Sequence, residues 1–437
     1  MLAFFYRQPP NIQPRAPGTP IHVTYRPRIV DARLDSALRS AGGVVLDGPR
    51  GCGKTRTALE HAASSVSFDR DPNARLLAQT APDALLSGPI PRLLDEWQLV
   101  PEIWGSVRGA IDDRAQPGQF ILTGSAVPVD NDTRHTGAAR FIRLKMRPCT
   151  LAELGVSSGA VSLAALLNAD VMTAADTGLT VPELLSHVTV GGFPGVQGTA
   201  GDTLDVHREY LASVAHADIP RLLGRTPRPA RLEAVIRALA RHSGGPMTAT
   251  AIAADAVTPG RPIDPDTVAL YLDTLTRIHL IEPLQSWGTH LRSRSRQRSA
   301  PVVHLTDPAL AAAAIGATPH ALLQDLRLAG LLFKSLVIRD LRVYADDARG
   351  TVEQYRDNTG LEVDAIVTLS DGRWGAFEIK LGTFAIDDAV KSLRRFAAKV
   401  DTRVLGAPSV LGVIVGTGGA YRREDGIMVI PIGALGP

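Results

Sequence analysis

Short apolar runs alternate with amphipathic stretches along the first third of the chain. Residues 43–47 (GVVLD) and 119–123 (QFILT) are continuous apolar runs, which are typical of strands buried on both faces of a sheet. Residues 65–69 (SVSFD) and a short run that ends at Asp95 are further strand candidates, and a helix is expected from Lys54. Strands that alternate with helices predict a parallel sheet covered on both faces.

The middle of the chain has a helical pattern. Residues 150–230 are rich in Ala and Leu and are expected to be mainly helical. Three apolar-periodic segments follow, at residues 232–241, 248–254 and 264–277, and the apolar strand HLIEPLQSW comes after them. Three helices and a strand in this order predict a winged helix-turn-helix, although a plain helical lid would show the same pattern.

The last part of the chain returns to a mixed pattern from about residue 300. Asp307-Pro308 is expected to cap a helix after the strand VVHLT. The remaining expected elements form a compact α/β unit. They are a helix at 329–343, strands at 352–356, 361–369 and 374–380, a helix at 386–399 and a strand at 411–416.

Composition excludes several classes of protein. The formal net charge is only +3, so any nucleic-acid surface must be local rather than a property of the whole chain. The two cysteines cannot build a disulfide framework, and they fit a reducing, cytoplasmic location. No apolar run approaches the ~18 residues that a membrane-spanning helix needs, and the first apolar patch is too short for a signal peptide. We therefore expect no membrane partner.

The clearest motif is GPRGCGKT, which matches the phosphate-binding pattern GxxxxGK[ST] in full. Glycines allow successive backbone N–H groups to curl round a phosphate, and the following helix directs its positive end at it. Lys54 is expected to reach the β- and γ-phosphates of ATP, and Thr55 to bind Mg²⁺. The predicted nucleotide-binding residues are Gly48, Pro49, Arg50, Gly51, Cys52, Gly53, Lys54 and Thr55.

Two further elements follow the motif in the order that ATP hydrolysis requires. In LLDEWQ, Asp95 is expected to hold Mg²⁺, and Glu96 to act as the general base on the attacking water. An isolated acidic pair is more often a solvated turn, but this pair lies between two strand candidates. In FILTGS, Thr123 and Ser125 end a buried strand, where a hydroxyl could reach the γ-phosphate or orient the water.

Arginines offer the positive charge that would stabilise the transferred phosphate. Arg134 and Arg140, in DTRHTGAAR, are the candidates, and Arg140 is preferred as a catalytic residue. Either could act within its own chain or from a neighbouring subunit. Because basic residues number 47 and all but six of them are arginine, each single assignment is weak.

A second constellation lies near the C-terminus. Asp364 is in one expected strand, and Glu378 and Lys380 are two residues apart in the next, so that both of these point to the same face. The turn SDG would fold the two strands into a hairpin and bring Asp364 close to Glu378. Two carboxylates can hold a divalent metal ion for phosphodiester cleavage. A hairpin with a charged solvent face would have the same spacing.

With these motifs in place, the chain from about residue 28 resembles the prokaryotic AAA+-type ATPases whose C-terminal domain of unknown function is related to PD-(D/E)XK nucleases. The motifs that carry the resemblance are GPRGCGKT, LLDEWQ, FILTGS, GAAR, GGFP, YRDNTGLEVDAIV and EIKLG. The resemblance implies nucleotide roles for Lys54, Thr55, Asp95 and Glu96. It also implies a nuclease-like site at Asp364, Glu378 and Lys380, with Asp364 and Glu378 as metal ligands.

One residue departs from the pattern of the family. Similar proteins usually carry a glutamate early in the first helix of the last domain, in a pattern like G-x-x-F-E. In LAGLLFKS the corresponding residue is Lys334. A third carboxylate is therefore missing, and we expect Lys334 to pair with Glu378 and to weaken or abolish cleavage.

A local basic row is the strongest nucleic-acid signal. In LRSRSRQRSA, Arg292, Arg294, Arg296 and Arg298 recur at every second position, which places them on one face of an extended segment. Such a row could follow the phosphates of double- or single-stranded DNA in a salt-dependent way, with little sequence specificity. A solvated arginine loop without a ligand, or a loop that meets an acidic protein surface, fits the same residues.

We therefore predict an α/β protein with ATP and Mg²⁺ as cofactors. The expected parts are an extended arm (1–27), a P-loop AAA+-type ATPase core with a parallel sheet (28–150), a helical lid or linker (151–230), a winged helix-turn-helix (231–300) and a PD-(D/E)XK-like α/β domain (301–437). An ATPase that acts on DNA is the favoured function. The alternatives are an ATP-controlled protein-binding switch and an active ATP-coupled nuclease. Assembly into a homo-oligomer is a further expectation.

Overall fold

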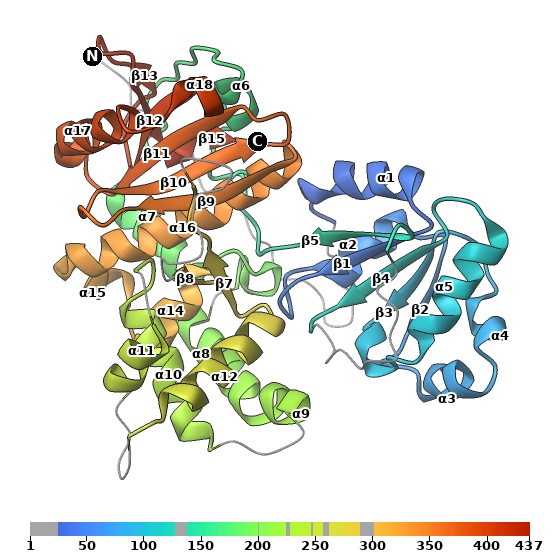
Figure 1. Cartoon of the computed structure of the whole chain (residues 1–437). Helices are drawn as coiled ribbons and strands as arrows, with labels where there is room; N and C mark the ends of the chain where they lie inside the picture. Colours follow the sequence, from blue (N-terminus) through green and yellow to red (C-terminus); the bar gives the residue numbers. More distant parts are fainter. Residues whose placement is uncertain are drawn as a thin grey trace, which may run out of the picture.

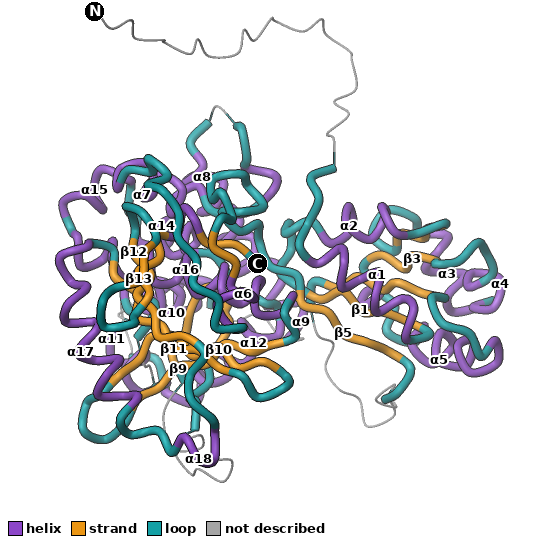
Figure 2. Tube along the Cα trace, turned by 90° about the horizontal axis from the view of Figure 1, so that it is seen from above, coloured by secondary structure: helices purple, strands orange, loops and turns teal. Residues whose placement is uncertain are grey.

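The computed structural model describes residues 25–126, 138–199, 201–223, 228–245, 248–256, 262–288 and 301–437. Figure 1 shows two lobes: the five-stranded sheet with its helices forms one, and the rest of the chain forms the other. The view from above, in Figure 2, separates the same two lobes. We call residues 25–145 the N-terminal lobe. Arg134 and the four arginines from Arg292 to Arg298 lie outside the described residues.

The N-terminal lobe is built on a parallel sheet of order β2-β3-β4-β1-β5, which confirms the predicted core. Each pair of neighbouring strands runs in the same direction, so the carboxyl ends of all five meet at one edge. The strands are β1 (Gly43–Asp47), β2 (Ser64–Ser67), β3 (Arg92–Asp95), β4 (Phe120–Gly124) and β5 (Phe141–Lys145).

Helices cover both faces of this sheet, and the apolar run of β1 explains why. Val44 and Leu46 face the cluster that contains Leu34 of α1 and Ala58 of α2, whereas Val45 faces the opposite cluster, under α3, α4 and α5. A strand buried on both faces is apolar at nearly every position, as β1 is up to Leu46. The helices are α1 (Val30–Ser40), α2 (Lys54–His61), α3 (Pro72–Thr80), α4 (Pro82–Leu86), η1 (Trp97–Leu99) and α5 (Ile103–Arg114).

The middle of the chain is mainly helical, as expected. Its elements are β6 (Val161–Ser162), α6 (Leu163–Leu167), α7 (Val181–Val190), η2 (Pro194–Val196), α8 (Thr203–Ser213), the π-helix η3 (Val214–Asp218), α9 (Ile219–Leu223), α10 (Pro229–Arg241), α11 (Ala249–Asp255), α12 (Pro265–Arg277), β7 (Ile281–Leu284), β8 (Val302–Leu305), α14 (Pro308–Ile315) and α15 (Pro319–Gln324). Three helices, α10 to α12, precede the antiparallel pair of β7 and β8. The order is the expected one, and the winged-helix assignment stays a prediction.

The C-terminal part contains a six-stranded mixed sheet of order β13-β14-β12-β11-β10-β9. Helix α16 covers one face, where its Phe333 packs in one cluster with Phe377, and α17 covers the other with Phe396 and Trp374. The elements are α16 (Leu326–Asp347), β9 (Gly350–Arg356), β10 (Glu362–Leu369), β11 (Trp374–Lys380), η4 (Thr383–Ala385), α17 (Ile386–Ala397), α18 (Thr402–Leu405), β12 (Val410–Val415), β13 (Tyr421–Arg422), β14 (Met428–Pro431), η5 (Ile432–Ala434) and β15 (Leu435–Gly436).

The middle and C-terminal parts are packed together into the second lobe. The backbone N–H of Trp287, just after β7, donates to the carbonyl of Gln354 in β9 at 2.6 Å. The Trp287 ring packs against Trp374, with ring centroids 5.2 Å apart. At the other end of the chain, β15 pairs with β6. Segments that are distant along the chain therefore hold this lobe together.

Candidate nucleotide and C-terminal sites

The GPRGCGKT loop leaves the carboxyl end of β1 and leads into α2, as the motif requires. Gly51 and Gly53 have φ values of +80° and +106°, a region that favours glycine. A Cβ atom at Gly48 would come within 2.1 Å of the carbonyl oxygen of Met146. The glycines of the motif are therefore required by backbone conformation and by close packing against the segment after β5.

Lys54 lies at the first position of α2 and is buried. Its Nζ donates to the carbonyl oxygens of Gly48 (2.8 Å) and Pro49 (2.9 Å), so the ammonium group lies inside the curve of the loop. A phosphate held by the loop would meet this ammonium group directly.

Three neighbouring strands bring the acidic site together. Ser67, Asp95 and Thr123 are register partners at the carboxyl ends of β2, β3 and β4. One oxygen of the Asp95 carboxylate accepts from the hydroxyls of Thr55 (2.7 Å) and Thr123 (2.5 Å), and the other accepts from Ser67 (3.3 Å). The hydroxyl of Thr55 beside a carboxylate is an oxygen donor set that fits Mg²⁺.

Glu96, the residue after Asp95, has a left-handed backbone conformation with φ +57°. Its backbone N–H donates to the hydroxyl of Thr123 at 3.2 Å, and its carboxylate accepts from the Ser125 hydroxyl at 3.0 Å. Gln98 also donates to this carboxylate. Thr123 therefore holds the backbone of the acidic pair, and its action on the γ-phosphate or on the attacking water stays a prediction. Gln98 was missed by the sequence reasoning, although it belongs to the LLDEWQ motif.

The C-terminal residues also come together. Lys380 Nζ lies 2.6 Å from Glu378 Oε2 and 3.5 Å from Asp364 Oδ2. Asp364 Oδ2 also accepts from the backbone N–H of Ile379 at 2.8 Å. The hairpin of β10 and β11 thus brings the side chains of Asp364, Glu378 and Lys380 together on one side of the sheet.

The predicted pairing of Lys334 with Glu378 was wrong. Lys334 Nζ contacts Asp364 Oδ1 at 2.5 Å instead, because α16 packs against β9, β10 and β11 and places Lys334 beside Asp364 of β10. Burial raises the pKa of Glu378 to about 7, and the Asp364 carboxylate beside it adds to this effect. Burial alone would raise the pKa of Asp364 as well, but Lys334 and Lys380 outweigh it and hold that pKa below its usual range.

Three family models match different parts of the chain. The model of the AAA domain matches residues 41–155. Models of two domains of unknown function, DUF8612 and DUF4143, match residues 181–321 and 329–435. This match supports a P-loop ATPase core, and we call residues 41–155 the ATPase domain.

Similar whole proteins have been found in mycobacteria. The uncharacterized protein Rv2008c of Mycobacterium tuberculosis (strain ATCC 25618 / H37Rv) is 26% identical over 357 residues, which cover 80% of this chain and 72% of that protein. The uncharacterized protein Mb2031c of Mycobacterium bovis (strain ATCC BAA-935 / AF2122/97) shows the same values.

Solved structures resemble the chain only in part. The Walker-type ATPase PABY2304 of Pyrococcus abyssi superimposes with a TM-score of 0.39 at 15% identity, over 65% of this chain and 94% of that one. The ORC1 protein of Aeropyrum pernix in complex with DNA gives a TM-score of 0.24 at 14% identity, over 67% and 93%. These low scores support no argument about function.

Arg140 lies at the wrong edge of the ATPase domain for a contact with the γ-phosphate in its own chain. It directly precedes β5, and its carbonyl accepts from the N–H of Gly43, the first residue of β1. The P-loop follows the opposite end of β1. The Arg140 guanidinium instead pairs with Asp112 at 2.6 Å on the surface. A role within its own chain is therefore excluded, and a role toward a second copy stays a prediction.

Residues far from the motif hold the P-loop from outside. Arg28 donates to the carbonyls of Cys52 (2.9 Å) and Arg147 (2.8 Å) and forms an ion pair with Glu153 at 3.0 Å. Arg50, within the loop, lies 3.7 Å from Asp218 of the π-helix η3. No sequence pattern pointed to the pair of Arg28 and Glu153, because the two residues are 125 positions apart in the chain.

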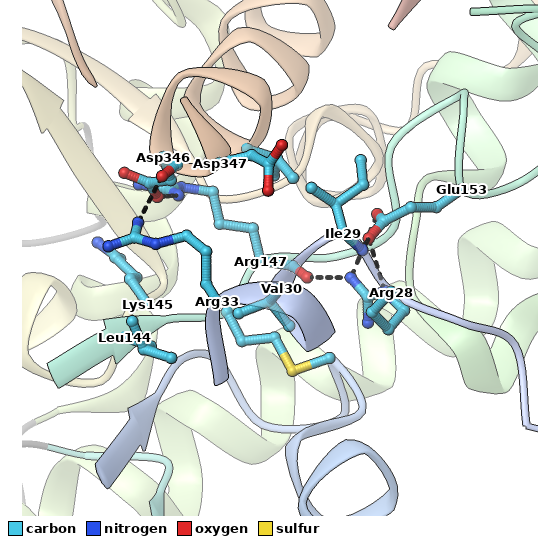
Figure 3. A pocket seen from close by; sticks show the side chains of 12 residues that line it. Arg28, Ile29, Val30, Arg33, Leu144, Lys145, Arg147, Glu153, Asp346 and Asp347 are labelled. Carbon is cyan, nitrogen blue, oxygen red and sulfur yellow. Dashed lines mark hydrogen bonds and ion pairs between the residues drawn. The ribbon is translucent and has the colours of Figure 1, made fainter. Parts of the chain in front are cut away.

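An ion network connects the ATPase domain to the second lobe. Glu282 of β7 pairs with Lys145 at 3.1 Å, Arg147 at 2.6 Å and Arg342 at 3.5 Å. Arg147 also pairs with Asp346, near the end of α16. Figure 3 shows Arg147 and Asp346 beside a small cavity between the two lobes. Burial alone would raise the pKa of Glu282, but the surrounding cations outweigh it and hold that pKa well below its usual range.

Two features of the described residues bear on the expected partners. Within these ranges no helix combines the length and the apolar character that crossing a membrane requires. The described ranges also hold no group of three or more His, Cys, Asp or Glu side chains placed to bind a metal ion.

Proposed function

We propose that this protein is an ATPase that hydrolyses ATP with Mg²⁺ and acts on DNA. The observation that carries the proposal is the convergence of Thr55, Asp95, Glu96 and Thr123 at the end of the sheet where the P-loop begins. An AAA-type domain over the same residues supports it.

Each group has a defined part in the proposed reaction. Lys54 and the loop N–H groups bind the β- and γ-phosphates, and Thr55 and Asp95 hold the metal ion, which neutralises phosphate charge when bound. Glu96 accepts the proton of the water that attacks the γ-phosphorus, as the bond to the bridging oxygen of ADP breaks. Ser125 and Gln98 hold the Glu96 carboxylate in place.

The test uses two substitutions at the site and two matched controls. Lys54→Ala should abolish ATP binding, whereas Glu96→Gln should bind ATP and lose at least ~100-fold in turnover, because only the base is removed. Lys391→Ala and Glu362→Gln change exposed residues of the C-terminal sheet and its helix, and both should retain wild-type turnover. Undiminished turnover in Glu96→Gln would remove Glu96 from the mechanism.

The DNA part of the proposal rests on the arginine row at 292–298, between β7 and β8. Changing Arg292, Arg294, Arg296 and Arg298 together to Ser should weaken DNA binding and flatten its dependence on salt, because phosphate contacts release counterions. The measurement is fluorescence anisotropy with a labelled oligonucleotide over a salt titration. Equal affinities and equal slopes would remove this segment as the DNA contact.

A protein-binding switch is the second candidate, and the ion network around Glu282 favours it. The network joins β5 of the ATPase domain to β7 and α16, so a nucleotide-dependent shift of β5 would reach the second lobe. ATP turnover with and without DNA separates the two functions. DNA-stimulated turnover supports the first, and turnover indifferent to DNA supports the second.

A further inference from the structure

Three polar atoms surround the end of β4, beside the P-loop. A Cβ atom built on Gly124 would lie 3.1 Å from Oε1 of Gln98 and 3.2 Å from Nε1 of Trp97. Oδ1 of Asp47 lies 3.6 Å from the same point. The carbonyl of Gly124 accepts from the N–H of Gly48, the first residue of the P-loop, at 3.3 Å. Because Gly124 has no side chain, the three polar atoms border one small space next to this loop.

Two of these atoms are buried and unpaired. Nε1 of Trp97, a residue that is 2% exposed, has no hydrogen-bond partner among the described residues, and neither has Oε1 of Gln98. One atom is a donor and the other an acceptor, yet they do not bond to each other. Because an unpaired polar atom in the interior is costly, a small polar molecule between the two would be stabilising.

The orientation of the Gln98 amide is fixed at its nitrogen end. Nε2 donates to the Glu96 carboxylate and, at 3.1 Å, to the hydroxyl of Ser125. An amide turned the other way would place its oxygen against the carboxylate, and two acceptors cannot bond. Oε1 is therefore the atom that borders the space at Gly124.

The chemistry around this space matches a water molecule. Oδ2 of Asp47 accepts from Arg143 at 2.9 Å, and Oδ1 is the oxygen that borders the space. The N–H of Trp97 opposes a cation, and the carboxylate of Asp47 opposes an anion. A water would accept one hydrogen bond from the indole and donate one each to Oε1 of Gln98 and Oδ1 of Asp47. Three hydrogen bonds are the usual number for a buried water.

We propose that a bound water bridges Trp97, Gln98 and Asp47. Through this water, Trp97 and Asp47 act as positioning residues for Glu96, the proposed general base. The water holds the oxygen end of the Gln98 amide, so the nitrogen end stays against the Glu96 carboxylate. Gly124 keeps the space open for the water. The inference rests on the proposed ATPase function.

The first experiment measures kcat for ATP and the affinity for a fluorescent ATP analogue in the full chain. Trp97→Phe keeps a ring against Trp104, whose centroid is 5.0 Å away, and removes the N–H. It should lower kcat ~5–20-fold, as the loss of one buried hydrogen bond predicts. The affinity should stay within about twofold, because the P-loop is unchanged. Trp374→Phe, the matched control, removes an indole N–H from the C-terminal sheet and should retain the wild-type kcat.

A double-mutant cycle tests whether Trp97 acts through Gln98. Gln98→Met has a similar length but no amide, so it should lower kcat by itself. Adding Trp97→Phe to Gln98→Met should cause little further loss, because the water then has no amide to hold. Losses that multiply in the double variant would overturn the inference, since they would assign Trp97 to packing alone.

The water itself is tested by a crystal structure of the wild-type chain without nucleotide. A water within hydrogen-bond distance of Trp97 Nε1, Gln98 Oε1 and Asp47 Oδ1 is expected. Gly124→Ala should displace this water and lower kcat as Trp97→Phe does, because its methyl group would press on both unpaired atoms. Absence of the water from the wild type, or a direct bond from the indole N–H to a protein oxygen, would overturn the inference.

The kinetic outcomes separate the inference from the proposed function. A wild-type kcat in Trp97→Phe would overturn the inference alone. Absence of ATP turnover by the wild-type chain would overturn the proposed function and the positioning role that rests on it. The crystal structure reports on the bound water in either case.

Discussion

The buried carboxylate of Glu282 is expected to hold the two lobes together. Its side chain is 13% exposed and contacts Lys145, Arg147 and Arg342. Glu282→Gln keeps the shape of the side chain and removes its charge, so three cations remain close together with less negative charge between them. Breaking a buried ion pair from one side costs about 3–5 kcal/mol, a large share of the about 5–15 kcal/mol that stabilises a typical domain.

The assay is urea unfolding followed by tryptophan fluorescence, with limited proteolysis to detect separation of the lobes. The control is Glu362→Gln on β10, which removes the same charge from a half-exposed pair with Arg356 at 3.3 Å. Such a surface pair contributes at most about 1 kcal/mol. Glu282→Gln should therefore unfold at a clearly lower urea concentration than Glu362→Gln.

The pH dependence gives this prediction a second check. Because the pKa of Glu282 is depressed in the folded chain, its contribution is fully present above the unfolded value near 4.5 and is lost as pH falls through the folded value. The difference in unfolding free energy between wild type and Glu282→Gln should thus be constant from about pH 6 to 8. This difference should become smaller only at acidic pH. A urea midpoint for Glu282→Gln equal to that of Glu362→Gln would refute the reasoning.

Three further predictions follow from single contacts. Gly48→Ala should abolish ATP binding, measured with a fluorescent nucleotide, because its Cβ would meet the Met146 carbonyl at 2.1 Å. Thr123→Val should cost about 1–3 kcal/mol in unfolding free energy and slow ATP turnover, since Asp95 loses a buried hydrogen bond; wild-type values in both assays would contradict this role. Glu378, whose pKa is raised to about 7, should make the wild type lose stability as pH rises from about 4.5 to 7, and Glu378→Gln should remove that decline; identical pH profiles of the two proteins would disprove it.

Local patterns in the sequence were sufficient for β1, α2 and the P-loop between them, and for the hairpin of β10 and β11. The P-loop is one contiguous segment between a strand and a helix, so its glycines and Lys54 could be placed without any distant contact. The convergence of Asp364 with Glu378 and Lys380 followed from strand periodicity and one tight turn. Asp95 and Glu96 could be assigned to the nucleotide site because the pair follows the P-loop and lies between two expected strands of a parallel sheet.

The tertiary structure decided every relation between segments distant along the chain. Packing of α16 over the sheet took Lys334 to Asp364 rather than to Glu378, and strand direction placed Arg140 at the edge opposite the P-loop. The ion network of Arg147 and Glu282 joins residues 135 positions apart, for which no periodicity or spacing exists in the sequence. The periodicity of apolar residues indicates which face of a helix or strand is buried. The partner of each charged side chain depends instead on how the elements pack against one another.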